Sequence, residues 1–248
     1  MIVADPRNPQ ARHHLELLRA HLAEGDEGDA TVVIGGDGFM LHTIEELGLD
    51  RTYLGLNAGR IGFLLNDVHD WAAAAAALRQ RSYRVWRFPV LEARIVRSDG
   101  TVCVEQAVND VVLERSTGQT AHLRLVIDGT EVVGTLTCDG LIFSTALGST
   151  AYTFSAGGPA CHPTLPVFAV TAICPHTPRL APFLLPTTAT ARVEVRASER
   201  RPVRAVTDGR RVDDVVAVDL WSSASQVQVA WFDGHDFTAC MVAKILRA

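Results

Sequence analysis

The stretch Val32-Val33-Ile34-Gly35-Gly36-Asp37-Gly38 decides the fold of the first part of the chain. Its β-forming residues predict a short buried strand, and the glycines that follow predict a tight turn into a helix from about Phe39 to Gly48. A helix N-terminus presents backbone N–H groups and partial positive charge, and glycines let a phosphate approach that backbone closely. A carboxylate in such a place suits proton or hydroxyl chemistry beside a phosphate, which makes Asp37 a catalytic candidate. The alternative is a structural turn in which Asp37 caps the helix.

Size and composition narrow the class of protein. The 248 residues carry a net charge of −5 and no basic run, which argues against nucleic-acid binding. No signal peptide is recognisable at the start, and the alanine run at residues 72–77 is too short to span a bilayer. The five cysteines form no Cys-x-x-Cys pair, so we expect reduced thiols in a cytoplasmic protein, with neither disulfides nor a zinc site.

Residues 1–82 alternate between strand and helix patterns. A strand at residues 2–4 precedes a helix signalled by Asn8-Pro9, and a strand at 53–56 precedes a helix from Trp71 to Leu78, capped by Asp67 or Asp70. Such alternation predicts an α/β domain with a parallel sheet and flanking helices.

From residue 83 to 232 the pattern becomes that of a β-rich second domain. Apolar and polar residues alternate, and Asp99-Gly100 and Asp128-Gly129 are typical of hairpin turns. Residues 233–248 form a last segment, helical over 238–246, that we expect to return to the first domain. The predicted strands of the second domain are residues 83–88, 91–96, 124–127, 132–136, 141–145, 191–195, 203–206, 215–220 and 227–231.

Three further clusters in the chain have the composition of ligand loops. Asn109-Asp110 places an amide and a carboxylate between apolar residues, which suits a sugar diol or an adenine edge, although an Asx turn is the structural alternative. Residues 138–159 are dense in small hydroxyl residues that admit a flat ligand. Thr207-Asp208-Gly209 is by default a hairpin turn.

The chain resembles the NAD kinases that use ATP or polyphosphate. The block Gly148-Ser149-Thr150-Ala151-Tyr152 with its Gly157-Gly158-Pro159 tail is the most specific motif, whereas the first glycine turn is shared with lipid kinases and, more loosely, with phosphofructokinases. Five motifs recur in family order over almost the whole chain: Gly35-Gly36-Asp37-Gly38; residues 57–64, Asn-Ala-Gly-Arg-Ile-Gly-Phe-Leu; Asn109-Asp110; residues 139–159; and Ile173-Cys174-Pro175-His176 with Leu184-Leu185-Pro186.

The resemblance implies an NAD kinase or diacylglycerol kinase-like fold with NAD bound between the two domains. It implies that Asp37 is the catalytic base and that the glycine turn takes the phosphate donor, ATP with Mg²⁺ or another divalent metal, without a metal ligand that we can name. It also implies a homodimer or homotetramer. The nucleotide-binding candidates are Gly35, Gly36, Gly38, Asn57, Arg60, Asn109, Asp110, Asp139, Thr150, Ala151, Tyr152, Ser155 and Asp208.

The implied reaction moves the γ-phosphoryl group of ATP to the 2′-hydroxyl of the adenosine ribose of NAD, giving NADP. Three positions depart from the family pattern: Phe39 replaces a small hydroxyl residue, Asp110 replaces a glutamate, and Ala146 replaces a proline. Two other functions stay open at this point. One is a lipid kinase of the diacylglycerol type that shares the glycine turn, and the other is an NAD(P)-sensing protein that has lost turnover.

Overall fold

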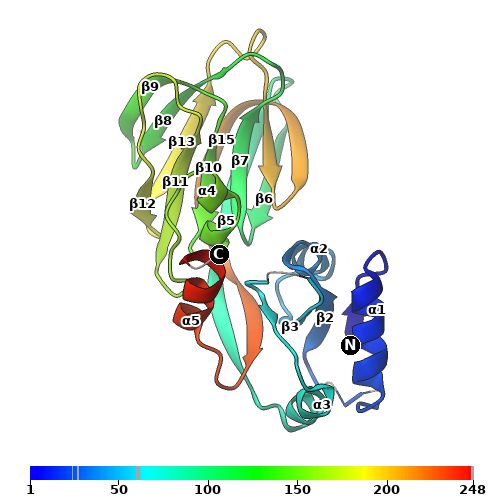
Figure 1. Cartoon of the computed structure of the whole chain (residues 1–248). Coiled ribbons are helices and arrows are strands. Elements are labelled where there is room, and N and C mark those ends of the chain that lie inside the picture. Colours follow the sequence, from blue (N-terminus) through cyan, green and yellow to red (C-terminus); the bar gives the residue numbers. More distant parts are fainter. Residues whose placement is uncertain (24, 27, 60–61, 247–248) are drawn as a thin grey trace. The chain divides into compact units, whose positions relative to one another are not determined.

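The computed structural model describes residues 1–23, 25–26, 28–59 and 62–246, with the backbone alone at residues 244 and 246 (Figure 1). The chain divides into two compact units. Unit 1 combines Met1–Phe88 with Gln226–Ala248, and unit 2 is the continuous segment Pro89–Ser225. The sequence predicts domain boundaries after residues 82 and 232. The difference arises because strands β5 (Tyr83–Arg97) and β15 (Arg210–Phe232) run through both units, so the change of pattern at residue 83 marks the start of a strand.

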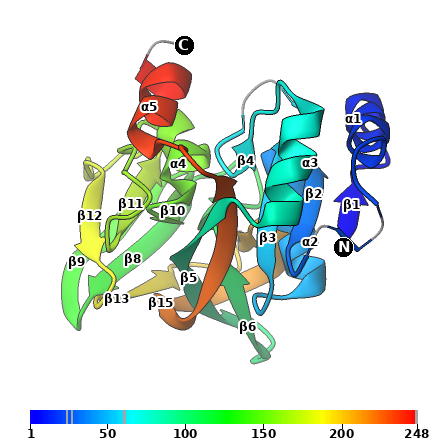
Figure 2. The same ribbon diagram turned by 90° about the horizontal axis from the view of Figure 1, so that it is seen from below.

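Unit 1 is built on a parallel sheet in the order β1-β2-β3-β15, with β4 paired to β3. Strand alternation divides its residues between two faces. The α1 and α3 helices share one apolar core with Val32 and Leu54, whereas the α carbon of Gly35 faces Phe39 of α2. Figure 2 shows α2 on the opposite side of these strands from α1 and α3. The other elements of this part are β1 (Ile2–Ala4), α1 (Pro9–Arg19), β2 (Thr31–Gly35), α2 (Asp37–Leu47), β3 (Thr52–Asn57), β4 (Leu65–Asn66) and α3 (Trp71–Gln80).

The helix starts of unit 1 follow their predicted caps, with one exception. Asn8 caps α1, and the Asp70 carboxylate caps α3 by accepting the Ala73 N–H at 3.0 Å. The helix α2 begins at Asp37, two residues earlier than predicted, and its N-cap is Gly36, which makes no side-chain capping bond. The alternative that Asp37 is a helix cap is therefore wrong.

The C-terminal segment of unit 1 consists of α5 (Phe237–Met241) and one π-helical turn (Val242–Leu246). Phe237 packs edge-on against Trp231, with ring centroids 4.9 Å apart, and also contacts Phe88. These aromatic contacts fix the segment to the parts of β5 and β15 that belong to unit 1. In the described part of the chain, no helix has the length and apolar character needed to cross a membrane.

Unit 2 is antiparallel and encloses its own apolar core, with members from Leu91 to Leu220. Its central strands run in the order β15-β14-β7-β10-β11-β12. Two predictions of separate strands were wrong, because β5 continues through Pro89 and β15 continues through residues 221–226, where apolar alternation is lost but the backbone stays extended. The other elements of this unit are β6 (Val102–Ala107), β7 (Asp110–Arg115), β8 (Ala121–Ile127), β9 (Thr130–Cys138), β10 (Gly140–Thr145), η1 (Gly148–Thr150), α4 (Tyr152–Ser155), β11 (Val167–Ile173), β12 (Phe183–Pro186), β13 (Thr190–Val195) and β14 (Val203–Thr207).

Candidate active site

The glycines of the first turn differ in what surrounds them. A β carbon added to Gly35 would lie 2.8 Å from the ring of Phe39, so this glycine is needed for packing. Among the described residues, a β carbon added to Gly36 or Gly38 would meet no atom within 4 Å, and neither residue has positive φ. The fold itself therefore does not require glycine at these two positions. Open backbone at the start of α2 fits an anion that approaches the first N–H groups of the helix.

The carboxylate of Asp37 joins the glycine turn to the second glycine loop, residues 57–64. Its Oδ1 accepts the N–H groups of Phe63 at 3.1 Å and Leu64 at 3.0 Å, and its Oδ2 accepts that of Phe63 at 2.9 Å. Three N–H bonds to one carboxylate fix the orientation of the group. Two loops that the sequence presented separately thus form one structure.

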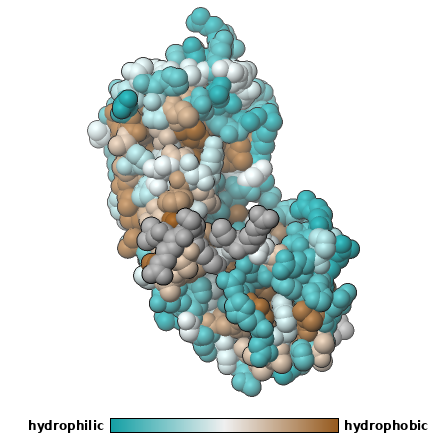
Figure 3. Space-filling view, in the orientation of Figure 1, coloured by the Kyte–Doolittle hydropathy of each residue, from teal (hydrophilic) through white to brown (hydrophobic). Residues whose placement is uncertain are grey.

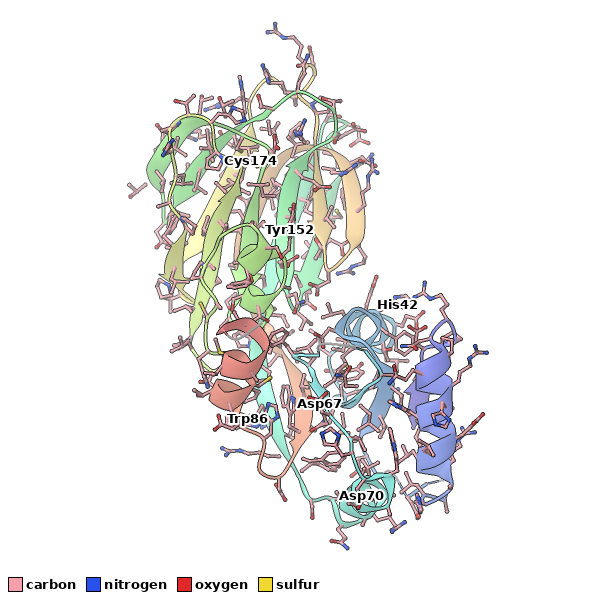
Figure 4. All side chains as sticks on the ribbon, viewed as in Figure 1. His42, Asp67, Asp70, Trp86, Tyr152 and Cys174 are labelled. Atoms are coloured by element: carbon pink, nitrogen blue, oxygen red, sulfur yellow. The ribbon has the colours of Figure 1, made fainter. Side chains whose placement is uncertain are left out.

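Asn57, a predicted nucleotide contact, uses its side chain within this second loop. Its Oδ1 accepts the Gly59 N–H at 2.8 Å and its Nδ2 donates to Asp67 at 2.7 Å. The candidate Arg60 lies outside the described residues. Figure 4 shows Asp67 and Asp70 near α3, where they line a pocket of about 250 Å³ with Phe232 and with alanines of that helix. None of the predicted site residues that the structure describes lines this pocket.

The remaining candidates belong to unit 2 and gather around β7. Asn109 and Asp110 precede and begin β7, Ser144 of β10 pairs with Asp110, and the Asp208 N–H donates to the Asp110 carbonyl at 3.2 Å. The Asp208 carboxylate accepts the N–H groups of residues 108, 109 and 110. Within the described residues the side chains of Asn109 and Asp110 make no hydrogen bond.

Two neighbouring carboxyl groups give this region unusual electrostatics. Burial, with the charge of Asp208 as a second cause, raises the pKa of Asp110 to about 7. Burial also raises the pKa of Asp208, but three backbone N–H donors and the charge of Arg210 oppose the effect there. Among the described residues no such donors oppose the effect at Asp110, so the pKa of this carboxyl lies near neutral pH.

The hydroxyl-rich loop lies directly against this pair. A β carbon on Gly148 would come within 2.3 Å of the Asn109 carbonyl oxygen, so only glycine permits the contact. Thr150 is half-buried, and Ala151, Tyr152 and Ser155 are exposed. These residues therefore lie at the surface, on a loop whose base is fixed to Asn109.

Tyr152 stands on α4 beside several acidic groups. Burial raises the pKa of its hydroxyl, and the charges of Glu114, Cys174, Asp110 and Asp139 raise it further. Figure 4 shows Tyr152 and Cys174 on the same face of unit 2, and Figure 3 shows apolar surface there. Tyr152 is 42% exposed, so its ring is available for a flat ligand to stack on.

Asp139 is held by an arginine that the sequence did not indicate. Arg115 contacts its two carboxylate oxygens, from Nε at 2.9 Å and from a terminal nitrogen at 3.4 Å. Arg204 similarly holds Glu114 at 2.5 Å. Thr145, buried below the hydroxyl-rich loop, was also missed. These residues follow no motif spacing, and only the pairing of β7, β10 and β14 brings them to the site.

No group of three or more His, Cys, Asp or Glu side chains within the described ranges is arranged to hold a metal ion. The candidates Gly35, Gly36, Asp37, Gly38 and Asn57 belong to unit 1. The candidates of unit 2 are Asn109, Asp110, Asp139, Thr150, Ala151, Tyr152, Ser155 and Asp208.

Solved structures share this fold. Yeast NADH kinase complexed with NADH superposes with a TM-score of 0.86 and 22% identity, covering 99% of this chain and 86% of the yeast chain. An NAD kinase from Archaeoglobus fulgidus in complex with ATP gives a TM-score of 0.75 and 23% identity, covering 100% of this chain and 97% of the archaeal chain. The predicted fold class, an α/β unit with a β-rich unit, is confirmed.

Sequence comparison reaches the same family. A family model described as the ATP-NAD kinase C-terminal domain matches residues 108–230. The NAD kinase of Cereibacter sphaeroides is 38% identical over 234 residues, which cover 92% of this chain and 90% of that protein. The resemblance that the five motifs indicated is confirmed, and the chain belongs to the NAD kinase family.

Proposed function

We propose that this protein is an NAD kinase that transfers the γ-phosphoryl group of ATP to the 2′-hydroxyl of the adenosine ribose of NAD, giving NADP. The observation that carries this function is the 38% identity to an NAD kinase over 92% of the chain. The chemistry of both units supports it. One unit offers an open glycine turn with a carboxylate, and the other offers an amide, a carboxyl group and an exposed aromatic ring.

Unit 2 supplies NAD binding in this proposal. Asn109 can donate to and accept from ribose hydroxyls, and ionised Asp110 accepts from them. The ring of Tyr152 provides a stacking surface, and Asp139, oriented by Arg115, supplies a further acceptor. These groups recognise a dinucleotide by its hydroxyl groups and its flat bases.

Unit 1 supplies donor binding and the base. Phosphate oxygens bind the N–H groups at the start of α2, next to Gly36 and Gly38. Asp37, oriented by the peptides of Phe63 and Leu64, accepts the proton of the attacking hydroxyl. Mg²⁺ enters with ATP as part of the substrate and, when bound, neutralises phosphate charge.

The test is an assay of the purified protein with NAD and MgATP, in which NADP is measured by an NADP-dependent dehydrogenase. Asp37→Asn should lower turnover by about 10²–10⁴-fold, since general base assistance has that magnitude, while NAD binding is kept. The matched control is Asp70→Asn, another aspartate of unit 1, because asparagine caps a helix as well as aspartate does. Near-normal turnover in Asp37→Asn would exclude Asp37 as the base.

The same assay decides the two other functions. Phosphorylation of diacylglycerol in place of NAD would indicate a lipid kinase. Calorimetric binding of NAD without product would indicate a sensing protein. No observation in the structure favours either of them.

Several finer properties belong to the proposal. The divalent metal requirement, the use of ATP or polyphosphate, and assembly as a homodimer or homotetramer are supported by family membership. A cytoplasmic location is supported by the well-separated cysteines.

A further inference from the structure

The peptide backbone of residues 108–110 is held completely by two residues far away in the sequence. The Asp208 carboxylate accepts the N–H groups of Val108 at 2.5 Å, Asn109 at 2.9 Å and Asp110 at 3.1 Å. The Asp208 N–H donates to the Asp110 carbonyl at 3.2 Å. Thr145 serves the other two carbonyls, because its hydroxyl donates to Val108 at 2.7 Å and its N–H donates to Asn109 at 2.9 Å. All six backbone polar groups of the three residues are thus satisfied.

Thr145 also connects this backbone to the hydroxyl-rich loop. Its hydroxyl oxygen accepts the Gly148 N–H at 3.0 Å, and Gly148 in turn packs on the Asn109 backbone. Thr145 is only 3% exposed. The arrangement therefore fixes the backbone of Asn109 and Asp110 and the start of the segment that carries Tyr152 as one piece.

We propose that Asp208 and Thr145 are positioning residues for NAD, which touch no substrate atom and hold Asn109 and Asp110 in their binding geometry before NAD arrives. The inference rests on the proposed function. It assigns Asp208 a role different from the direct nucleotide contact that the resemblance implied, because the carboxylate is already committed to three peptide groups. Preorganisation of this kind lowers the cost of ordering polar groups on binding.

The chain contains a matched control for Asp208. Asp128 also precedes a glycine in a two-residue hairpin turn, with φ of 47° where Asp208 has 45°. Its N–H donates to the Thr190 carbonyl at 3.0 Å, and its carboxylate accepts the Thr190 N–H at 2.7 Å. In both cases an aspartate in an Asp-Gly hairpin turn binds the backbone of another segment. The segment that Asp128 binds is the start of β13, which carries none of the predicted site residues.

The experiment compares Asp208→Asn and Asp128→Asn in the full chain. In Asp208→Asn an amide group faces three N–H donors, so the Asn109-Asp110 backbone loses its geometry. We expect KM for NAD to rise by about ten- to a hundredfold, as for small displacements of substrate-binding groups, with KM for MgATP unchanged. Asp128→Asn should change neither constant. If the role of Asp208 were purely structural, Asp208→Asn would resemble Asp128→Asn. Both variants would then have a lower unfolding temperature, and KM for NAD would be unchanged in both.

A second readout uses the pH dependence of NAD affinity, measured by calorimetry between about pH 6 and pH 8. Protonated Asp110 cannot accept as an anion does, so affinity should weaken as pH falls through about 7, the raised pKa of this carboxyl. Asp208→Asn removes one of the two causes that raise the pKa, so the weakening should move to lower pH. The charge of Asp208 raises the pKa of the Asp110 carboxyl, and Arg210 at the start of β15 acts in turn on Asp208. Tyr152 of α4 interacts with Asp110, and Glu114 and Asp139 act on Tyr152.

Thr145→Val covers the case in which Asp208→Asn does not fold. It keeps the shape of the side chain and removes only the hydroxyl, so it should also raise KM for NAD without raising KM for MgATP. Unchanged NAD affinity and an unchanged pH profile in the folded variants would overturn the inference. Absence of NADP formation by the unaltered protein would instead overturn the proposed function, and the calorimetric titrations with NAD would still decide the inference.

Discussion

The glycines near the candidate site fall into two groups that differ in their surroundings. Gly35 and Gly148 lie against other atoms, the ring of Phe39 in one case and the Asn109 backbone in the other. A β carbon at Gly36 or Gly38 would meet none of the described atoms within 4 Å. Packing explains the first pair, and the second pair leaves open space that the proposed phosphate donor would use. Glycine is thus required for close packing at one pair of positions, and it borders open space at the other pair.

Gly38→Ala tests this distinction at a position inside the first turn of α2. Alanine is the better helix former, so the folded state should gain up to about 1 kcal/mol. The added methyl group should at the same time obstruct the phosphate donor and raise KM for MgATP, with KM for NAD unchanged. Thermal unfolding and steady-state kinetics measure the two effects. A stabilised variant with normal KM for MgATP would show that the open space at Gly38 is not a donor site.

The sequence indicates candidate residues for the chemistry more readily than the residues that hold those candidates in place. Asp37 and the Asn109-Asp110 pair stand in short motifs whose composition is itself informative. Asp208 is joined to Val108 across 100 residues, and Thr145 is one hydroxyl among many in its loop. A role that depends on a distant partner leaves no local pattern, and only the pairing of β14, β7 and β10 reveals it.

At the level of elements, the site depends on how closely the turn after β10 approaches the start of β7. Gly140 and Gly148 bracket this region, and a β carbon on Gly140 would lie 2.2 Å from the Leu113 carbonyl oxygen. The glycines thus allow β10 and the following 3₁₀ turn to lie directly on the neighbouring backbone. Glycine at these two positions therefore serves the contact between elements.

Gly148→Ala should separate the 3₁₀ turn from the 108–110 backbone. The methyl group cannot be accommodated without movement, because the Asn109 carbonyl oxygen, α carbon and carbonyl carbon would lie at 2.3, 2.4 and 2.6 Å. We expect a loss of about 1–3 kcal/mol in unfolding free energy, which is typical of overpacking, and weaker NAD binding. Denaturant unfolding and calorimetry check both parts. Gly129→Ala in an open turn offers a comparison in which stability changes without an effect on NAD.

Element boundaries show where local patterns were sufficient and where they were not. Local sequence was sufficient at the helix caps Asn8 and Asp70 and at the Asp-Gly turns, because each pattern spans only a few residues. The helices and hairpins predicted there are confirmed. The sequence predicts two strands where the structure has the single strand β15. The reason is that apolar and polar residues do not alternate at Trp221 and the polar residues after it. Its extended backbone is imposed by the strands on either side, β13 in one unit and β3 in the other.

At the scale of the whole molecule, the chain leaves unit 1 at Phe88 and re-enters it at Gln226. Unit 2 is therefore one uninterrupted stretch with a core of its own, running from Leu91 to Leu220. A fragment of residues 89–225 should fold and bind NAD, because this core and the Asp208 and Thr145 bonds lie within it. It should not form NADP, because it lacks Asp37. Circular dichroism, calorimetry and the coupled assay test these expectations, and an unfolded fragment would contradict them.

This nested order of the chain has a consequence for how such proteins can be altered. A gene segment that encodes the inner stretch can be exchanged for that of a relative at two junctions, both inside extended strands. If unit 2 binds the dinucleotide as proposed, the exchange should import the dinucleotide preference of the relative and leave the proposed donor residues of unit 1 unchanged. Coenzyme preference would then be a property that one exchanged segment transfers.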